Sequence, residues 1–227
     1  MAMQQKAVLF WDFDGTLVYS NQSFLESLEK AVGDGNPAVT PQQCKEFLQS
    51  ACSWNCPQRS FPERTGEAWW QDLLEKLKAF LEDCNIQDPE AICTDFRRYA
   101  SSYSYRLYED AREVLQEIRA RGYPCYLLSS NFPELRETVK NLALTEFFTD
   151  ICLSSELGYE KPREELFRLA LEKAGNPELA WMIGDNPVSD IQGAARAGLH
   201  TILVHPRAAC PEAEYACRTL REILDIL

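Results

Sequence analysis

The chain has 227 residues, of which 23 are Lys or Arg and 35 are Asp or Glu, and its formal net charge is −12. So acidic a composition argues against a nucleic-acid partner, because surfaces that bind a phosphate backbone need clustered Lys and Arg. An acidic protein that binds an anionic substrate needs a local cation. We therefore look for a metal site.

The chain carries no signal for a membrane or for secretion. No apolar run reaches the roughly 20 residues of a membrane span, and the N-terminal run is too short for a secretory signal. We expect a cytoplasmic protein without a membrane partner. The nine cysteines are scattered and odd in number, which favours reduced thiols. Cys52 and Cys56 have no histidine nearby in sequence, which disfavours a zinc site.

The first predicted strand covers residues 6–11 and ends in Asp12-Phe13-Asp14-Gly15-Thr16-Leu17. A short apolar run that stops at acids and a glycine turn is typical of a buried parallel strand. Open α/β sheets bind their ligands at that end of the strands. Two acids around one aromatic residue are also common on solvated turns, so later segments must decide between the two interpretations.

Residues 17–108 contain no convincing strand and are predicted to be a helical insertion. Apolar residues recur there at helical spacing. A capping box begins at Thr40, and Asp88 followed by Pro89 predicts the start of another helix.

An irregular stretch, residues 51–66, interrupts these helices. It either connects two helices, which ordinary loop statistics favour, or lies over a substrate. Tyr19, Asn21 and residues 54–66 are candidates for selecting the substrate, although an apolar or capping role explains each nearly as well.

From residue 109 onward, short apolar runs alternate with helical patterns. The runs cover residues 124–128, 149–153, 180–183 and 201–204. This alternation predicts βαβ units and a parallel sheet, so the fold class is α/β.

Ser129, Ser130 and Asn131 follow the strand predicted over residues 124–128. Small hydroxyl and amide side chains at that place, with backbone N–H groups, can bind a phosphate. The alternative is that they cap the next helix, and by itself the segment favours the cap.

Lys161 precedes Pro162 at the start of a predicted helix. A lysine in such a place is usually a solvated surface charge. Beside converged carboxylates and a phosphate dianion, however, an ammonium would neutralise the excess negative charge.

Asp185 stands at the tip of the strand over residues 180–183, and Asp190 in the first turn of the next helix. Carboxylates without His or Cys suit Mg²⁺, which prefers oxygen ligands. The alternative for Asp190 is a purely electrostatic role at a helix N-terminus.

Taken together, these segments resemble the four motifs of the haloacid dehalogenase-like hydrolase superfamily, which contains phosphoglycolate phosphatases. The matching residues are Asp12-Phe13-Asp14-Gly15-Thr16-Leu17, Ser130-Asn131, Lys161-Pro162, and Gly184-Asp185 with Asp190. Trp69-Trp70 and the Ser130-Asn131-Phe132 run are most similar to the branch known as REG-2-like.

The resemblance implies a Rossmann-like, doubly wound parallel sheet of order 5-4-1-2-3 with an inserted α-helical cap domain. Residues 1–16 and 109–227 would form the catalytic core, and residues 17–108 the cap. Two departures, Trp11 before the first acid and Arg163-Glu164 after Pro162, lie outside the implied catalytic set.

The resemblance also implies roles for the acids. Asp12 would attack phosphorus and become an aspartyl phosphate, while Asp14 would protonate the leaving alcohol and then activate water. Mg²⁺ would be held by the side chains of Asp12 and Asp185 and by the main-chain carbonyl of Asp14, with Asp190 orienting a metal-bound water.

Four further residues would bind the phosphorylated substrate by the same resemblance. Thr16, Ser130 and Asn131 would contact the phosphoryl oxygens, and Lys161 would balance their charge. The implied protein is a Mg²⁺-dependent phosphatase of a small phosphorylated metabolite, and the sequence carries no signal for its oligomeric state.

Two alternatives stay open. A phosphomutase of the same superfamily also keeps both acids, whereas haloalkanoic acid dehalogenases lack the acid at Asp14. A non-catalytic phosphoacceptor or binding protein also has an Asp cluster, a hydroxyl residue and a Lys, but needs neither Asp14 nor an insertion of about ninety residues.

Overall fold

One parallel sheet organises the fold. The computed structural model describes residues 7–33 and 36–227. Six strands pair in the order β3-β2-β1-β4-β5-β6, all parallel. They are β1 (Val8–Trp11), β2 (Cys125–Ser129), β3 (Asp150–Leu153), β4 (Ala180–Gly184), β5 (His200–Val204) and β6 (Tyr215–Cys217).

The α/β fold class and the strand order 5-4-1-2-3 are confirmed, and β6 extends the sheet at one edge. Residue 6, the first of the predicted strand 6–11, lies outside the described residues. The sequence did not predict β6, because it is three residues long and two of them are exposed. A run of three residues is too short to predict a strand.

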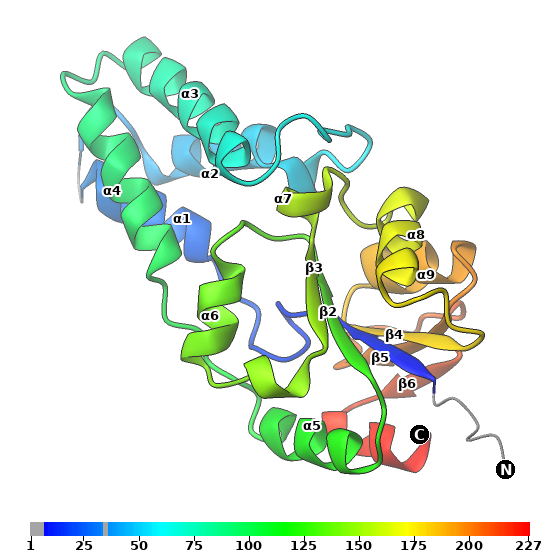
Figure 1. The fold of residues 1–227 in the computed structure, drawn as a ribbon. Coiled ribbons are helices and arrows are strands. Elements are labelled where there is room, and N and C mark those ends of the chain that lie inside the picture. Colours follow the sequence, from blue (N-terminus) through cyan, green and yellow to red (C-terminus); the bar gives the residue numbers. More distant parts are fainter. Residues whose placement is uncertain (1–6, 34–35) are drawn as a thin grey trace, which may run out of the picture.

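Helices lie in the connections between consecutive strands from β1 to β5, whereas residues 205–214, between β5 and β6, contain none (Figure 1). The helices of eight or more residues are α1 (Ser23–Val32), α2 (Pro41–Ala51), α3 (Glu67–Asp83), α4 (Pro89–Ser101), α5 (Ala111–Ala120) and α8 (Glu164–Lys173). The shorter ones are η1 (Ser53–Asn55), α6 (Leu135–Asn141), η2 (Thr145–Phe147), α7 (Ser154–Leu157), the π-helical turn η3 (Pro187–Gln192), α9 (Gly193–Arg196) and η4 (Leu220–Asp225).

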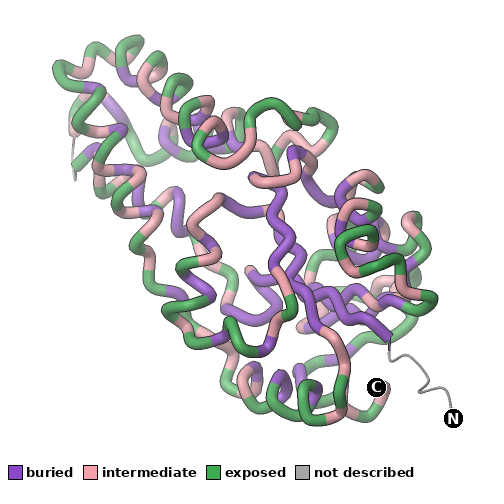
Figure 2. Tube along the Cα trace, in the orientation of Figure 1, coloured by how far each residue is buried: buried purple, intermediate pink, exposed green. Residues whose placement is uncertain are grey.

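The sheet is covered on both faces because side chains of a strand alternate between them. Leu9 and Trp11 of β1 belong to a buried cluster with residues of α5 and α6. Val8 and Phe10 point the other way and join a cluster with α8 and α9. The strands β1 and β2 are accordingly buried at every residue (Figure 2).

Helices α1 to α4 pack on one another and form a third hydrophobic cluster (Figure 1). The expected helix starts are present: Thr40 and Gln43 form the capping box of α2, and Asp88 caps α4. Phe132, which follows β2, is buried in this cluster. Leu17 and Val18, by contrast, are buried in the cluster of the sheet.

Within residues 7–33 and 36–227, no helix is both long and apolar enough to cross a membrane. The cytoplasmic location stays a prediction. All nine cysteines are free thiols, as the sequence led us to expect.

Candidate active site

Asp12 and Asp14 leave the sheet at the carboxyl end of β1. The backbone N–H of Asp12 still donates to the carbonyl of Ile183 in β4, at 2.9 Å. The strand pairing therefore fixes the backbone of Asp12. Asp12 as a whole is 6% exposed, and its side chain points toward the ends of the neighbouring strands.

Three carboxylates meet at this edge of the sheet. Asp12, Asp185 and Asp190 each offer an oxygen atom, and these atoms all lie within 4.8 Å of one another. Asp185 directly follows β4, and Asp190 lies in η3. A set of only oxygen donors fits Mg²⁺ better than zinc. The carboxylate of Asp14 is outside this group.

Lys161 links two of these carboxylates. Its Nζ donates to Asp12 Oδ1 at 2.6 Å and to Asp190 Oδ1 at 2.5 Å, and its side chain is 3% exposed. If all three carboxylates are ionised, they and the ammonium leave a surplus of two negative charges. A divalent cation would balance that surplus, so the residues present fit a bound Mg²⁺.

Burial and mutual repulsion shift the acidities of the site. Burial, reinforced by Asp12 and Asp190, raises the pKa of Asp185 to about 7. Burial also raises the pKa of Asp190, although Lys161 opposes the shift. Burial alone would lower the pKa of Lys161, but the carboxylates of Asp12 and Asp190 outweigh it and raise that pKa. The lysine is therefore charged.

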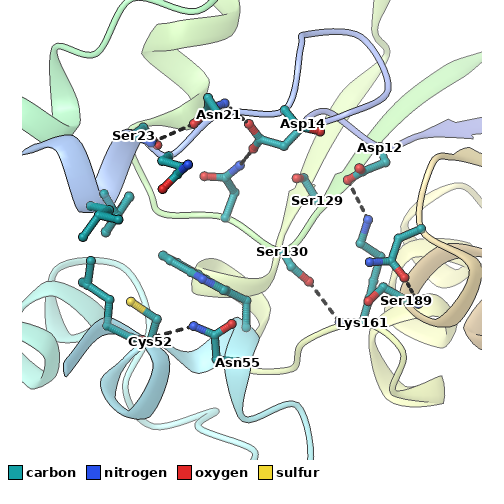
Figure 3. A pocket seen from close by; sticks show the side chains of 18 of the residues that line it. Asp12, Asp14, Asn21, Ser23, Cys52, Asn55, Ser129, Ser130, Lys161 and Ser189 are labelled. Atoms are coloured by element: carbon teal, nitrogen blue, oxygen red, sulfur yellow. Dashed lines mark hydrogen bonds and ion pairs between the residues drawn. The ribbon is translucent and has the colours of Figure 1, made fainter. Parts of the chain in front are cut away.

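Asp14 is held between two amides. Asn21 Nδ2 donates to Asp14 Oδ1 at 2.7 Å (Figure 3). Asn131 Nδ2 donates to Asp14 Oδ2, also at 2.7 Å. Burial, followed by repulsion from Asp12, raises the pKa of Asp14 to about 6 despite these hydrogen bonds. A carboxyl group with a pKa near neutrality can both donate and accept a proton.

Gly15, the glycine of the first motif, leaves the space that the carboxylate of Asp185 occupies. Gly15 has a φ of +81°, and a Cβ atom built on it would lie 2.3 Å from Asp185 Oδ2. Any side chain at position 15 would thus displace this carboxylate. The turn after β1 therefore lies directly against Asp185, the residue that follows β4.

Ser130 lies on the edge of the same site. Its hydroxyl accepts the backbone N–H of Lys161 at 3.1 Å, and both residues line one cavity. The backbone N–H of Asn131 donates to Ser154 Oγ at 3.0 Å. The helix-cap alternative for these residues is wrong, because α6 begins after Glu134 without a side-chain cap.

Two other predicted positions have different surroundings. Thr16 is fully buried, does not line the cavity, and its hydroxyl has no hydrogen-bond partner within the described part of the chain. Asp190 contacts a helix start as well as the site, because its Oδ2 accepts the N–H of Asn186 at 3.0 Å. The structure thus shows the helix-start contact of Asp190, while its role at a metal site stays a prediction.

A cavity of about 570 Å³ opens over these groups. We call its core side the floor; it consists of Asp12, Asp14, Ser129, Ser130, Asn131, Lys161, Asp185, Asn186, Ser189 and Asp190. We call the side from the helical segment the roof; it consists of Ser20, Asn21, Gln22, Ser23, Phe24, Leu25, Lys45, Leu48, Gln49, Cys52, Trp54, Asn55 and Tyr105. Figure 3 shows Cys52 and Asn55 across the space from Asp12.

The roof contains residues that sequence reasoning missed. Lys45, Leu48 and Gln49 were not candidates, and their only signal is helical spacing, which any surface helix shares. Cys52 belongs to the stretch 51–66, for which the sequence left a place over the substrate open. Of the earlier candidates, Asn21 lines the cavity, whereas Tyr19 donates to Glu109 Oε2 at 2.7 Å and does not line it.

The irregular stretch 51–66 connects α2 to α3 and also lines part of the cavity. Trp54 and Asn55 line the cavity. Farther along, the N–H of Phe61 donates to the carbonyl of Gly158 at 2.8 Å, and the N–H of Gly66 donates to that of Ser155 at 2.8 Å. The stretch is thus tied to the core.

Comparisons with known proteins agree with this geometry. A family model described as haloacid dehalogenase-like hydrolase matches residues 6–198. A phosphoserine phosphatase of Thermus thermophilus is 40% identical over 176 residues, which make up 77% of this chain but only 65% of that relative. Haloacid dehalogenase-like hydrolase domain-containing protein 3 of Mus musculus is 28% identical over 209 residues, 88% of this chain and 82% of the relative.

The suggested branch and the fold also find counterparts. The Rhythmically expressed gene 2 protein of Drosophila melanogaster is 28% identical over 160 residues, 65% of this chain and 60% of the relative. The solved structure of HAD-hydrolase YfnB from Bacillus subtilis, bound to magnesium, has a TM-score of 0.73 at 21% identity and covers 99% of both chains. That last likeness concerns the fold.

Proposed function

Because the chain belongs to the haloacid dehalogenase-like hydrolases, we propose that it is a Mg²⁺-dependent phosphatase that hydrolyses a small phosphorylated metabolite through an aspartyl phosphate. The observation that carries the proposal is the meeting of Asp12, Asp185 and Asp190, two of which pair with Lys161, in a cavity that Asp14 also lines. The similarity to a phosphoserine phosphatase supports phosphoric monoesters as the substrate class.

We assign residues 1–16 and 109–227 to a catalytic core and residues 17–108 to a cap. The separate hydrophobic cluster of α1 to α4 supports this division. The roof of the cavity comes from the same segment, which fits a cap that covers the substrate and excludes water.

Mg²⁺ would be held by the side chains of Asp12 and Asp185 and the main-chain carbonyl of Asp14, with Asp190 orienting a metal-bound water. When bound, the cation screens the repulsion between the anionic nucleophile and the phosphate. Lys161 would supply a second, fixed positive charge, as its raised pKa supports.

The reaction would proceed in two displacements at phosphorus. A carboxylate oxygen of Asp12 attacks phosphorus, the bond to the substrate oxygen breaks, and Asp14 gives its proton to the leaving alkoxide. Asp14 then removes a proton from water, the water oxygen attacks phosphorus, and the Asp12 carboxylate leaves. The products are the alcohol and inorganic phosphate.

Ser130, Asn131, Thr16 and Lys161 would bind the phosphoryl group. The cavity position of Ser130 and of Lys161 supports their assignment, and Asn131 would act while also positioning Asp14. Thr16 is the weakest of the four, since its buried hydroxyl is away from the cavity lining. It would act only through the turn that carries Asp14.

The test is phosphate release from p-nitrophenyl phosphate with Mg²⁺ or with EDTA, using the parent chain and Asp12→Asn. We expect turnover only in the parent with Mg²⁺, because an amide cannot act as the nucleophile; the loss should exceed about 10³-fold. Asp83→Asn, an exposed acid on α3, is the matched control and should keep parental activity.

Other outcomes would favour the alternatives. A stable phosphoprotein without turnover would favour a phosphoacceptor protein. Transfer of phosphate between two positions of a sugar phosphate, without release, would favour a phosphomutase. Turnover by Asp12→Asn equal to that of the parent would contradict the proposed nucleophile.

A further inference from the structure

The charges of the cavity are divided between its two sides. All four acids that line it, Asp12, Asp14, Asp185 and Asp190, belong to the floor. Among the described residues, the roof contributes a single charged side chain, that of Lys45. The second lysine of the lining, Lys161, lies on the floor and is already bound to two carboxylates.

Helix α2 presents Lys45 to the cavity as part of a continuous face. Cys52, which directly follows α2, lines the cavity, and so do Lys45, Leu48 and Gln49, the last two of which follow Lys45 by three and four residues. That spacing places them on one side of a helix. The capping box at Thr40 fixes where the helix begins and thereby which residues form this side.

Lys45 is exposed and uncommitted. No ion pair or hydrogen bond of its side chain is present in the part of the chain that the structure describes. The residues one turn away along α2 are Pro41, Gln42, Leu48 and Gln49, none of which is acidic. Glu46, its acidic neighbour in sequence, accepts from Gln42 Nε2 at 2.7 Å.

The ammonium group of Lys45 has no partner among the described residues and lines the same cavity as the four acids of the floor. Such a group is suited to bind an anion. The phosphoryl group belongs on the floor, where Lys161 and the proposed cation compensate it. Polar amides of Gln22, Gln49 and Asn55 stand in the same roof as Lys45 and can donate further hydrogen bonds. A cavity of about 570 Å³ has the size of a small-molecule site. The group bound on the floor and the group bound by Lys45 would therefore belong to one small ligand.

We propose that Lys45 is a specificity-determining residue and that the substrate is a small phosphomonoester with a second anionic group at its far end. This inference rests on the proposed phosphatase function. The second group is a carboxylate or a second phosphate, because an ammonium binds either one.

The test compares matched ligands that differ only in the second anion. The carboxylate pair is 3-phosphoglycerate and glycerol 3-phosphate; the phosphate pair is fructose 1,6-bisphosphate and fructose 6-phosphate. Dissociation constants are measured by calorimetry with Mg²⁺ in Asp12→Asn, which the proposed mechanism makes inert, and again after adding Lys45→Met. The kcat and KM of the chain with intact Asp12 are measured in parallel.

We expect the doubly anionic member of at least one pair to bind more tightly, and Lys45→Met to reduce that preference about fivefold, the scale of an exposed charge pair. Lys45→Arg should retain most of the preference. Lys140→Met, an exposed lysine on α6 away from the cavity, is the matched control and should leave the preference unchanged.

Two results would overturn the inference: no preference for the second anion in either pair, or an equal loss for both members on Lys45→Met. The pair that responds identifies the anion. Absence of turnover with every ligand and with p-nitrophenyl phosphate would instead overturn the proposed function, while the binding measurements would still decide the role of Lys45.

Discussion

The floor and the roof of the cavity are built on different principles. Asp12, Ser130 and Asp185 of the floor directly follow strands. Lys161 and Asp190, at 4% and 0% exposure, are held in a buried ion network. Roof residues such as Lys45 and Gln49 are exposed side chains on a helix. The floor can therefore hold reacting groups in fixed positions, whereas the roof can change its ligand preference without disturbing them.

The attachment of the roof is correspondingly local. Trp70 Nε1 donates to Glu134 Oε2 at 2.6 Å, which links α3 to the loop before α6. Phe132 inserts from the core into the aromatic cluster around Phe24. With the backbone hydrogen bonds of residues 61 and 66, these contacts hold the roof over the floor.

The largest effect should come from replacing Asp14, the proposed acid and base on the floor. Asp14→Asn removes the group proposed to exchange protons, so steady-state phosphate release should fall by about 10²–10⁴-fold. The aspartyl phosphate should persist longer in this variant. Asp95→Asn, which breaks only an exposed ion pair with Arg98, should retain full activity. Parental turnover in Asp14→Asn would rule out its acid–base role.

A smaller effect should follow from crowding the floor. Gly15→Ala places a methyl group against Asp185, and we expect Mg²⁺ affinity measured by calorimetry to fall about 10–100-fold. Gly175→Ala is the matched control, because Gly175 has a φ of +82° but no atom within 4 Å of its Cβ position. Both variants should lose about 1–2 kcal/mol of stability, but only the first should lose affinity.

The smallest of the three effects concerns the attachment of the roof. In Gly158→Ala the new Cβ would lie 2.4 Å from Pro62 Cα, so the stretch 56–66 must move. We expect KM to rise up to about tenfold and proteolysis within 56–66 to become faster. Gly175→Ala again controls for backbone strain. If Mg²⁺ affinity fell as far as in Gly15→Ala, the separation of roof from floor would be contradicted.

Sequence patterns were sufficient for the strands and for the acids. Each of the five longer strands is a largely buried, largely apolar run, and Asp12, Ser130 and Asp185 each directly follow one of them. Parallel strands bring their carboxyl ends to one edge, so the proximity of Asp12 and Asp185 follows from the pattern. The ion pairs of Lys161 could not be read in this way, because residue 161 lies outside any strand and a lysine before proline is usually solvated.

The amino-acid sequence by itself determined the sheet, the helical insertion and the acids at the strand ends, since these depend on local periodicity and on the direction of parallel strands. Only the tertiary structure decided that Asn21 and Asn131 hold Asp14, that Gly15 makes room for Asp185, and that one face of α2 looks into the cavity. Such contacts join residues far apart in the chain, and their geometry depends on how helices pack on the sheet, which no local pattern encodes.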